Sequence, residues 1–298
     1  MAARGNYKFL DKFSWYVPGV RSLFILLLWF IIGAVLGSIV TVICTVTLGI
    51  EAGTVYGSLL SYPIMFIPPM VYAGVKSASL SMDHAGVKLD SNNFSPLGGL
   101  LCVLLVSLMT LSAGFSLEPV TSLLPQMPDY LKQLFKDLTS GNIWLNLLMV
   151  SIFAPICEEW LCRGMVLRGL LASKVKPYVA ILVSALFFAF IHLNPWQAIP
   201  AFVLGCLFGY VYYKTGSLKL TMLMHFVNNT FALVVGHIDS FKEMESWKEV
   251  FPARTYWILV AACAMLMILC VLAFKKITLT KPEGNMDAVP SIFDTHED

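Results

Sequence analysis

Residues 143–172 read IWLNLLMVSIFAPICEEWLCRGMVLRGLLA, a largely apolar run with two adjacent carboxylates and an arginine near its centre. A run of about 20 apolar residues is long enough to cross a bilayer as a helix. A charged side chain at the middle of such a helix costs roughly 2.5–3.5 kcal/mol on insertion scales. Glu158, Glu159 and Arg163 therefore predict a functional site with a partner nearby, and purely structural pairing is the weaker alternative.

The whole chain has the composition of a membrane protein. Of its 298 residues, 58% are hydrophobic and 13% are charged, whereas a soluble domain has about 25% charged residues. The apolar runs are continuous and do not alternate, which favours membrane helices over a β-barrel. The net charge of +2 gives no indication of a nucleic-acid partner, and the lipid bilayer is the expected surrounding.

We predict an all-α polytopic membrane protein with about eight transmembrane helices. The apolar runs lie at 22–49, 57–75, 97–117, 143–172, 178–193, 197–213, 218–236 and 255–274. They divide the chain into a basic cytoplasmic leader (1–21), a single transmembrane domain (22–276) with a motif-bearing core at 143–236, and a tail (277–298). The tail is polar and acidic, so it is expected to be a disordered cytoplasmic segment.

The distribution of basic residues predicts the orientation of these helices. When the N-terminus is placed in the cytoplasm, most lysines and arginines fall in segments on that same side. Positively charged loops stay on the cytoplasmic side of a membrane, so both termini are expected there. A compact chain without eukaryotic sorting signals favours the bacterial inner membrane, with the active site reached from the cytoplasm.

Helix geometry separates the two glutamates at the centre of the 143–172 run. Residues four apart lie on the same face of a helix, whereas neighbours point to different faces. Glu159 is therefore expected to form an ion pair with Arg163 within its own helix. Glu158 is left on another face without the arginine, which makes it the candidate general base.

Two later runs contain further polar residues. FFAFIHL, residues 187–193, places Phe188 and His192 four apart, and MLMHFVNNTF, residues 222–231, does the same for His225 and Asn229. A lone buried histidine is usually a core residue, but polar groups in three runs are harder to explain in that way. Together with Glu158 they could hold a water, take its proton and stabilise an oxyanion. They could also be metal ligands, since imidazoles and a carboxylate suit Zn²⁺.

The segments EEWLCR (158–163), FAFIH (188–192) and HFVNN (225–229) follow the pattern EExxxR, FxxxH and HxxxN. In this order they resemble the CPBP (Abi) family of type II CAAX prenyl endopeptidases and bacteriocin-processing or self-immunity proteins. The resemblance covers residues 143–236 and implies an intramembrane endopeptidase that uses glutamate-activated water. Carried over by position, Glu158 is the general base, and His192, His225 and Asn229 position the water and stabilise the tetrahedral intermediate. Glu159, Arg163 and Phe188 support them.

The resemblance leaves several points open. It does not decide whether a metal is needed; if a zinc ion is bound, Glu158, His192 and His225 are its expected ligands. The substrate is expected to be a peptide or protein, with or without a lipid modification, and peptide processing and self-immunity are both compatible roles. A proton-coupled transporter that uses the buried Glu and His residues is one alternative function. A non-catalytic immunity protein with the same fold is another.

Overall fold

A computed structural model describes residues 9–80, 89–129, 131–132, 142–241, 244 and 246–277, and within these ranges the regular structure is entirely helical. The prediction of an all-α protein is therefore confirmed. The helices are α1 (Val20–Leu48), α2 (Ile50–Leu80), α3 (Gly99–Thr121), α8 (Pro177–Phe190), α9 (Pro195–Thr215), α10 (Leu218–His237) and α11 (Ala253–Lys275), together with one composite helix.

The composite helix covers residues 143–172 and is called the motif helix below. It consists of α5 (Ile143–Asn146), a π-helical segment η2 (Leu147–Phe153), α6 (Ala154–Glu159), a second π-helical segment η3 (Trp160–Leu167) and α7 (Arg168–Ala172). Short 3₁₀ turns lie at Phe9–Phe13 (η1), Asp239–Phe241 (η4) and Trp247–Glu249 (η5).

The described ranges thus contain eight long helical segments at the places expected from the apolar runs. Six of them are long and apolar enough to cross a membrane: α1, α2 (from Ala52), α3, the motif helix, α10 and α11. The helix α8 is shorter, with 14 residues, and α9 is not among the six. The expected number of helices is confirmed, whereas α8 and α9 do not meet the same criterion for a span.

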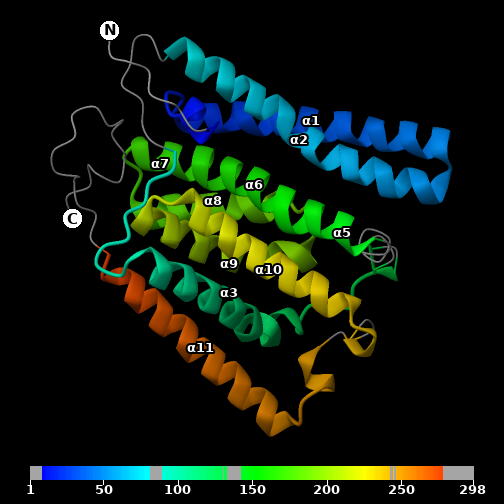
Figure 1. Ribbon diagram of the computed structural model, residues 1–298, viewed down its shortest axis with the longest axis vertical. Helices are drawn as coiled ribbons and strands as arrows, with labels where there is room; N and C mark the ends of the chain where they lie inside the picture. The colour runs from blue at the N-terminus through cyan, green and yellow to red at the C-terminus, as the bar shows by residue number, and fades with distance from the viewer. Residues whose placement is uncertain are drawn as a thin grey trace.

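The helices form three groups side by side (Figure 1). The hairpin of α1 and α2 makes one flank, and α11 with its neighbour α3 makes the other. The motif helix, α8, α9 and α10 lie between the two flanks. The residues of the FxxxH and HxxxN motifs and the two glutamates therefore belong to the middle group.

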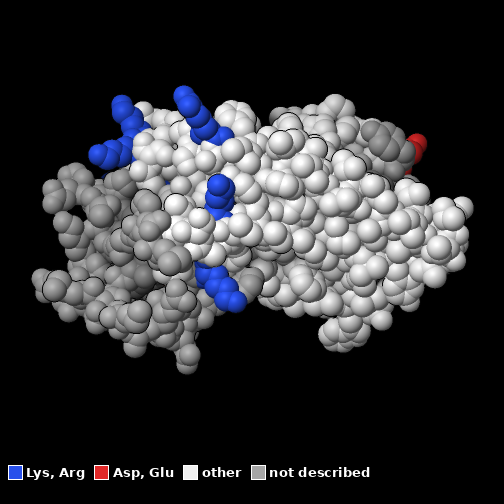
Figure 2. Space-filling view, turned by 90° about the horizontal axis from the view of Figure 1, so that it is seen from above, with Lys and Arg blue, Asp and Glu red and all other residues white. Residues whose placement is uncertain are grey.

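Basic side chains gather at one end of the bundle. The start of α1 and the ends of α2, α7, α9 and α11 meet there, and they carry Arg21, Lys76, Lys174, Lys214 and Lys275. Figure 2 shows lysines and arginines near this end, acidic atoms at the edge of the opposite end, and a broad uncharged surface between them. Such a surface suits lipid contact, because the hydrocarbon core penalises charge.

Part of the expected leader packs into this end of the bundle. Phe13 and Tyr16 are buried, and the buried guanidinium of Arg168 donates hydrogen bonds to the backbone carbonyls of both, at 3.2 and 2.6 Å. A Cβ atom at Gly169 would lie 2.2 Å from the carbonyl oxygen of Pro18, so glycine permits this close approach. Residues 1–8 of the leader and 278–298 of the expected disordered tail lie outside the described residues.

Small residues bring α1 and α2 together along their length. A Cβ atom added at Gly33 would lie 2.1 Å from the carbonyl oxygen of Met65, and one at Gly37 would lie 2.8 Å from that of Ser61. Close backbone approach at glycine is a common way for membrane helices to associate. These two contacts fix the depth of the segment of α2 between Ser61 and Met65.

Replacing Gly33 by alanine is expected to destabilise the protein by about 1–3 kcal/mol, because the added methyl group meets backbone and overpacks the hairpin. The matched control is Gly114→Ala in α3, where an added Cβ meets nothing within 4 Å. There the better helix propensity of alanine keeps or raises stability. Thermal unfolding of the two variants in detergent is the measurement, and equal stability of both would contradict the packing.

Candidate active site

The motif helix departs from regular α-helix on both sides of its glutamates. The backbone N–H of Ala154 donates to the carbonyl of Met149, five residues earlier, which is the π-helical pattern. Pro155 has no N–H to continue that pattern. In the π register, the carbonyl that loses its partner is that of Val150, whereas regular α-helix geometry would assign the loss to Ser151. π-helical turns are rare in proteins overall, and those that occur are often found at functional sites.

Asn229 supplies the donor that Pro155 lacks. Its Nδ2 donates to the carbonyl of Val150 at 2.8 Å, and its Oδ1 accepts from Nδ2 of Asn228 at 3.0 Å. These contacts fix the orientation of the amide, because a backbone carbonyl only accepts. They also tie α10 to the motif helix about two turns before the glutamates. Asn229 therefore contacts the motif helix at Val150, and its predicted role in the reaction stays a prediction.

An Asn229→Ala variant is expected to lose about 1–3 kcal/mol of stability, because the carbonyl of Val150 is left without a partner. The loss is smaller in a Pro155→Ala background, since alanine at position 155 restores a backbone N–H for that carbonyl. Denaturation of the two single variants and the double variant in detergent measures the coupling. Strictly additive losses would show that the two residues do not share this carbonyl.

Glu159 and Arg163 form the predicted ion pair within the motif helix. Nη1 of Arg163 lies 2.9 Å from Oε1 of Glu159, and both side chains are fully buried. Nη2 of Arg163 donates to the carbonyl of Gly205 at 2.9 Å. The guanidinium also lies over the rings of Phe188 and Phe208, at 4.6 and 5.3 Å from their centroids. The charge of the arginine is thus compensated from three sides.

The same carboxylate holds His225. Nδ1 of His225 lies 3.1 Å from Oε1 of Glu159. Since the carboxylate accepts, Nδ1 carries the hydrogen and Nε2 presents a lone pair. Glu159 thereby connects the arginine of its own helix to the histidine of α10. This contact gives Glu159 a role that helix periodicity did not indicate.

His192 has the same tautomer by a different contact. Its Nδ1 lies 2.8 Å from the carbonyl of Phe188, which only accepts, so Nε2 again presents the lone pair. The Phe188 ring lies edge-on to both imidazoles, with its centroid 5.0 Å from that of His192 and 5.4 Å from that of His225. Phe188 therefore sets the relative position of the two histidines.

The expectation that His192 lies within a membrane helix is wrong. The helix α8 ends at Phe190, and His192 lies in the turn before α9. Asn194 explains the early end: its Oδ1 caps α9 by accepting from the N–H of Gln197, and its Nδ2 donates to the carbonyl of His192. The backbone of Leu193 is left-handed, with φ 57°, which completes the reversal. His192 is half-buried as a result.

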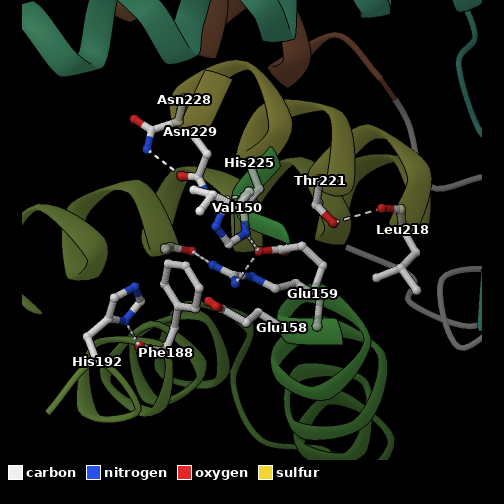
Figure 3. Close-up of polar contacts among 12 residues, drawn as sticks. Val150, Glu158, Glu159, Phe188, His192, Leu218, Thr221, His225, Asn228 and Asn229 are labelled. Carbon is white, nitrogen blue, oxygen red and sulfur yellow. Dashed lines mark hydrogen bonds and ion pairs between the residues drawn. The ribbon is translucent and has the colours of Figure 1, made fainter. Parts of the chain in front are cut away.

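The ion pair of Arg163 is made with Glu159, as helix geometry predicts, and the hydrogen bond of Glu158 comes from another helix. Glu158 is 8% exposed, and its Oε1 accepts a hydrogen bond from the hydroxyl of Tyr62 in α2. Its Oε2 has no hydrogen-bond partner among the described residues. In Figure 3 the carboxylate is directed toward the ring of Phe188, with His192 beyond the ring and His225 above it. A buried carboxylate oxygen without a donor is well suited to accept a proton.

Glu158, His192 and His225 are the side chains that a zinc site here would use. Within the described ranges, no three His, Cys, Asp or Glu side chains are grouped so that they could hold one metal ion. As placed in the described ranges, Glu158, His192 and His225 do not form the ligand set that tetrahedral Zn²⁺ takes from a protein.

Two residues of the site were missed by sequence reasoning. Tyr62 comes from α2, a helix without a recognisable motif, and the carbonyl of Gly205 comes from α9. A tyrosine in an apolar helix gives a weak signal, because a buried hydroxyl needs a partner. The carbonyl of Gly205 gives no sequence signal, because every residue has a backbone carbonyl. A Cβ there would lie 3.2 Å from Nη2 of Arg163, so the absence of a side chain is what admits the guanidinium.

An apolar groove of about 590 Å³ runs along α1 to the end of α8. The α1 wall includes Leu27, Phe30, Ile31, Val35 and Ile39, and the other wall consists of Phe190, Ile191 and Leu193. Because Ile191 and Leu193 adjoin His192 in the chain, the groove ends at the turn that carries this histidine. An extended apolar segment could lie in it with its end near the candidate site.

Comparison with known proteins gives one match. A family model described as type II CAAX prenyl endopeptidase Rce1-like matches residues 140–231. No curated protein and no solved structure matches the chain. The matched segment contains Glu158, Glu159, Arg163, both histidines and Asn229, and it does not include Tyr62. The part of the chain that carries the candidate active site is therefore similar to the Rce1-like type II CAAX prenyl endopeptidases.

Proposed function

We propose that this protein is an intramembrane endopeptidase that hydrolyses peptide bonds with water activated by Glu158. The observation that carries the proposal is the buried carboxylate of Glu158, whose Oε2 has no donor among the described residues. The carboxylate is directed toward Phe188, the ring that packs on the imidazoles of both His192 and His225 (Figure 3). The family match over the same segment supports this reaction class.

The first step is the attack of water on the scissile carbonyl. Oε2 of Glu158 takes one proton from the water while the water oxygen forms a bond to the carbonyl carbon. The second O–H of the water donates to Nε2 of one of the two imidazoles, that of His192 or that of His225, and this hydrogen bond orients the water. The fixed tautomers matter here, because each imidazole can accept only through the nitrogen that its backbone or carboxylate partner leaves free.

The tetrahedral intermediate carries a negative charge on the former carbonyl oxygen. Asn229 holds the carbonyl of Val150 with one N–H of its amide, and the second N–H is the proposed donor to that oxyanion. Collapse of the intermediate breaks the C–N bond, and the proton held by Glu158 passes to the leaving amine. The carboxylate is then ready for another water.

The substrate is a peptide or protein segment that reaches the site through the membrane region. The apolar groove along α1 suits a hydrophobic segment or a lipid-modified peptide, because its described walls are almost entirely aliphatic or aromatic. In this proposal the basic end of the bundle faces the cytoplasm, because positive loops stay inside, and the membrane is a bacterial inner membrane. Peptide processing and self-immunity are both roles for such an enzyme.

The test is cleavage of peptides by the purified protein in detergent, followed by mass spectrometry of the products. Peptides with and without a lipid-modified cysteine near the C-terminus distinguish the two substrate classes. A proton-coupled transporter would instead move a solute in proteoliposomes without any cleaved product. No cleavage of any peptide, together with solute flux that depends on Glu158, would reject the proposal in favour of transport.

A further inference from the structure

Tyr62 is the only described residue outside the family match that donates a hydrogen bond to a glutamate of the motif helix. Its hydroxyl donates to Oε1 of Glu158 across 96 residues of sequence. A hydrogen bond to an ionised group is roughly twice as strong as one between neutral groups. The α1–α2 hairpin therefore has a direct polar contact with the proposed catalytic base.

The position of Tyr62 is fixed by the packing of its own hairpin. The contacts of Gly33 with Met65 and of Gly37 with Ser61 lie on either side of it along α2. Its ring also packs on that of Phe66, with centroids 5.6 Å apart, and Phe66 packs on Phe30 of α1 at 5.3 Å. The hydroxyl is thus held at one depth relative to the motif helix.

The two oxygens of a carboxylate are chemically equivalent until a partner distinguishes them. Here Oε1 of Glu158 is occupied by the tyrosine hydroxyl, and Oε2 is buried without a donor among the described side chains and backbone groups. Fixing Oε1 also fixes rotation of the carboxylate about its last torsion. The oxygen that accepts the proton is therefore selected by a residue of α2.

We propose that Tyr62 is a positioning residue: it holds Oε1 of Glu158 so that Oε2 faces the attacking water. The inference rests on the proposed endopeptidase function and extends it to a helix that carries no motif. It also gives the α1–α2 hairpin a part in the reaction, because any displacement of α2 along α1 moves the hydroxyl away from the carboxylate.

The test compares Tyr62→Phe with Tyr56→Phe, a tyrosine of the same helix that is 49% exposed. Tyr62→Phe is expected to lower kcat about 10- to 100-fold with KM unchanged, since one hydrogen bond to a charged group is lost while the substrate contacts remain. Tyr56→Phe keeps the kcat of the unmodified protein. Incorporation of 4-aminophenylalanine at position 62 retains the ring and an N–H donor, and is expected to restore most of the lost kcat.

Several outcomes would overturn the inference. An unchanged kcat in Tyr62→Phe, or a loss that 4-aminophenylalanine does not restore, would show that the hydroxyl does not position Glu158. A rise in KM with unchanged kcat would assign Tyr62 to substrate binding. Failure of the proposed function itself is distinguishable, because the unmodified protein would then cleave no peptide, or cleavage would persist in Glu158→Gln. Thermal unfolding of each variant identifies any that lose activity through misfolding.

Discussion

Glu158→Gln is expected to reduce peptide cleavage by about 100- to 10,000-fold while the protein remains folded. This is the range that a positioned general base contributes to a hydrolysis. The amide oxygen of glutamine can still accept the hydrogen bond of Tyr62, so the contact between α2 and the motif helix is retained. The amide cannot take a proton from water, so kcat falls and the thermal unfolding temperature does not.

The matched control for this variant is Glu249→Gln in η5, the short turn before α11. It makes the same chemical change away from the candidate site, and its new amide oxygen can still accept from the backbone N–H of Ser246. Its cleavage rate is expected to equal that of the unmodified protein. If Glu158→Gln cleaves at the same rate as this control, Glu158 is not the base, and Glu159→Gln becomes the variant to examine.

Arg163→Met is expected to lower the free energy of unfolding by about 3–5 kcal/mol. Removing one partner of a buried ion pair leaves an uncompensated charge, here the fully buried carboxylate of Glu159. The carbonyl of Gly205 loses its donor as well. The cleavage rate is expected to fall as well. Without Arg163 the carboxylate of Glu159 loses the partner that fixes it, and this carboxylate in turn fixes the orientation and the tautomer of His225.

A double variant, Glu159→Gln with Arg163→Met, separates the charge from the packing. It removes both charges, so a substantial part of the lost stability is expected to return, whereas the orientation of His225 stays impaired. The control is Lys219→Met, which breaks an ion pair with Asp90 in which the lysine is 54% exposed. Surface pairs contribute only about 0–1 kcal/mol. Denaturation in detergent measures all three, and equal losses in Arg163→Met and Lys219→Met would contradict the buried network.

The polar residues of the candidate site were predictable from sequence for a simple energetic reason. A charged side chain within an apolar run raises the free energy of inserting the helix into the membrane. Glu158, Glu159 and Arg163 were therefore recognisable as candidate functional residues from the sequence. The spacing of four between Glu159 and Arg163 then gave their ion pair, which the structure confirms. The catalytic roles of Glu158, His192, His225 and Asn229 stay predictions until the variants are measured.

The end of α8 was not predictable in the same way. Hydropathy continues through Ile191 and Leu193, so the sequence suggested that His192 lies within a span. The chain turns earlier because Asn194 caps the next helix and binds the carbonyl of His192. A short local hydrogen-bonding pattern thus overrides the hydropathy at this point.

The sequence by itself determined that the protein is helical, where its helices lie, and which carboxylate pairs with the arginine. These properties depend on local composition and on spacing along one helix, and both are present in the linear chain. Three hydrogen bonds between helices were decided by the tertiary structure alone. They join Asn229 to the carbonyl of Val150, His225 to Glu159, and the hydroxyl of Tyr62 to Glu158. Each of these joins residues more than 60 positions apart, so it depends on how the helices pack and has no signature in any single segment.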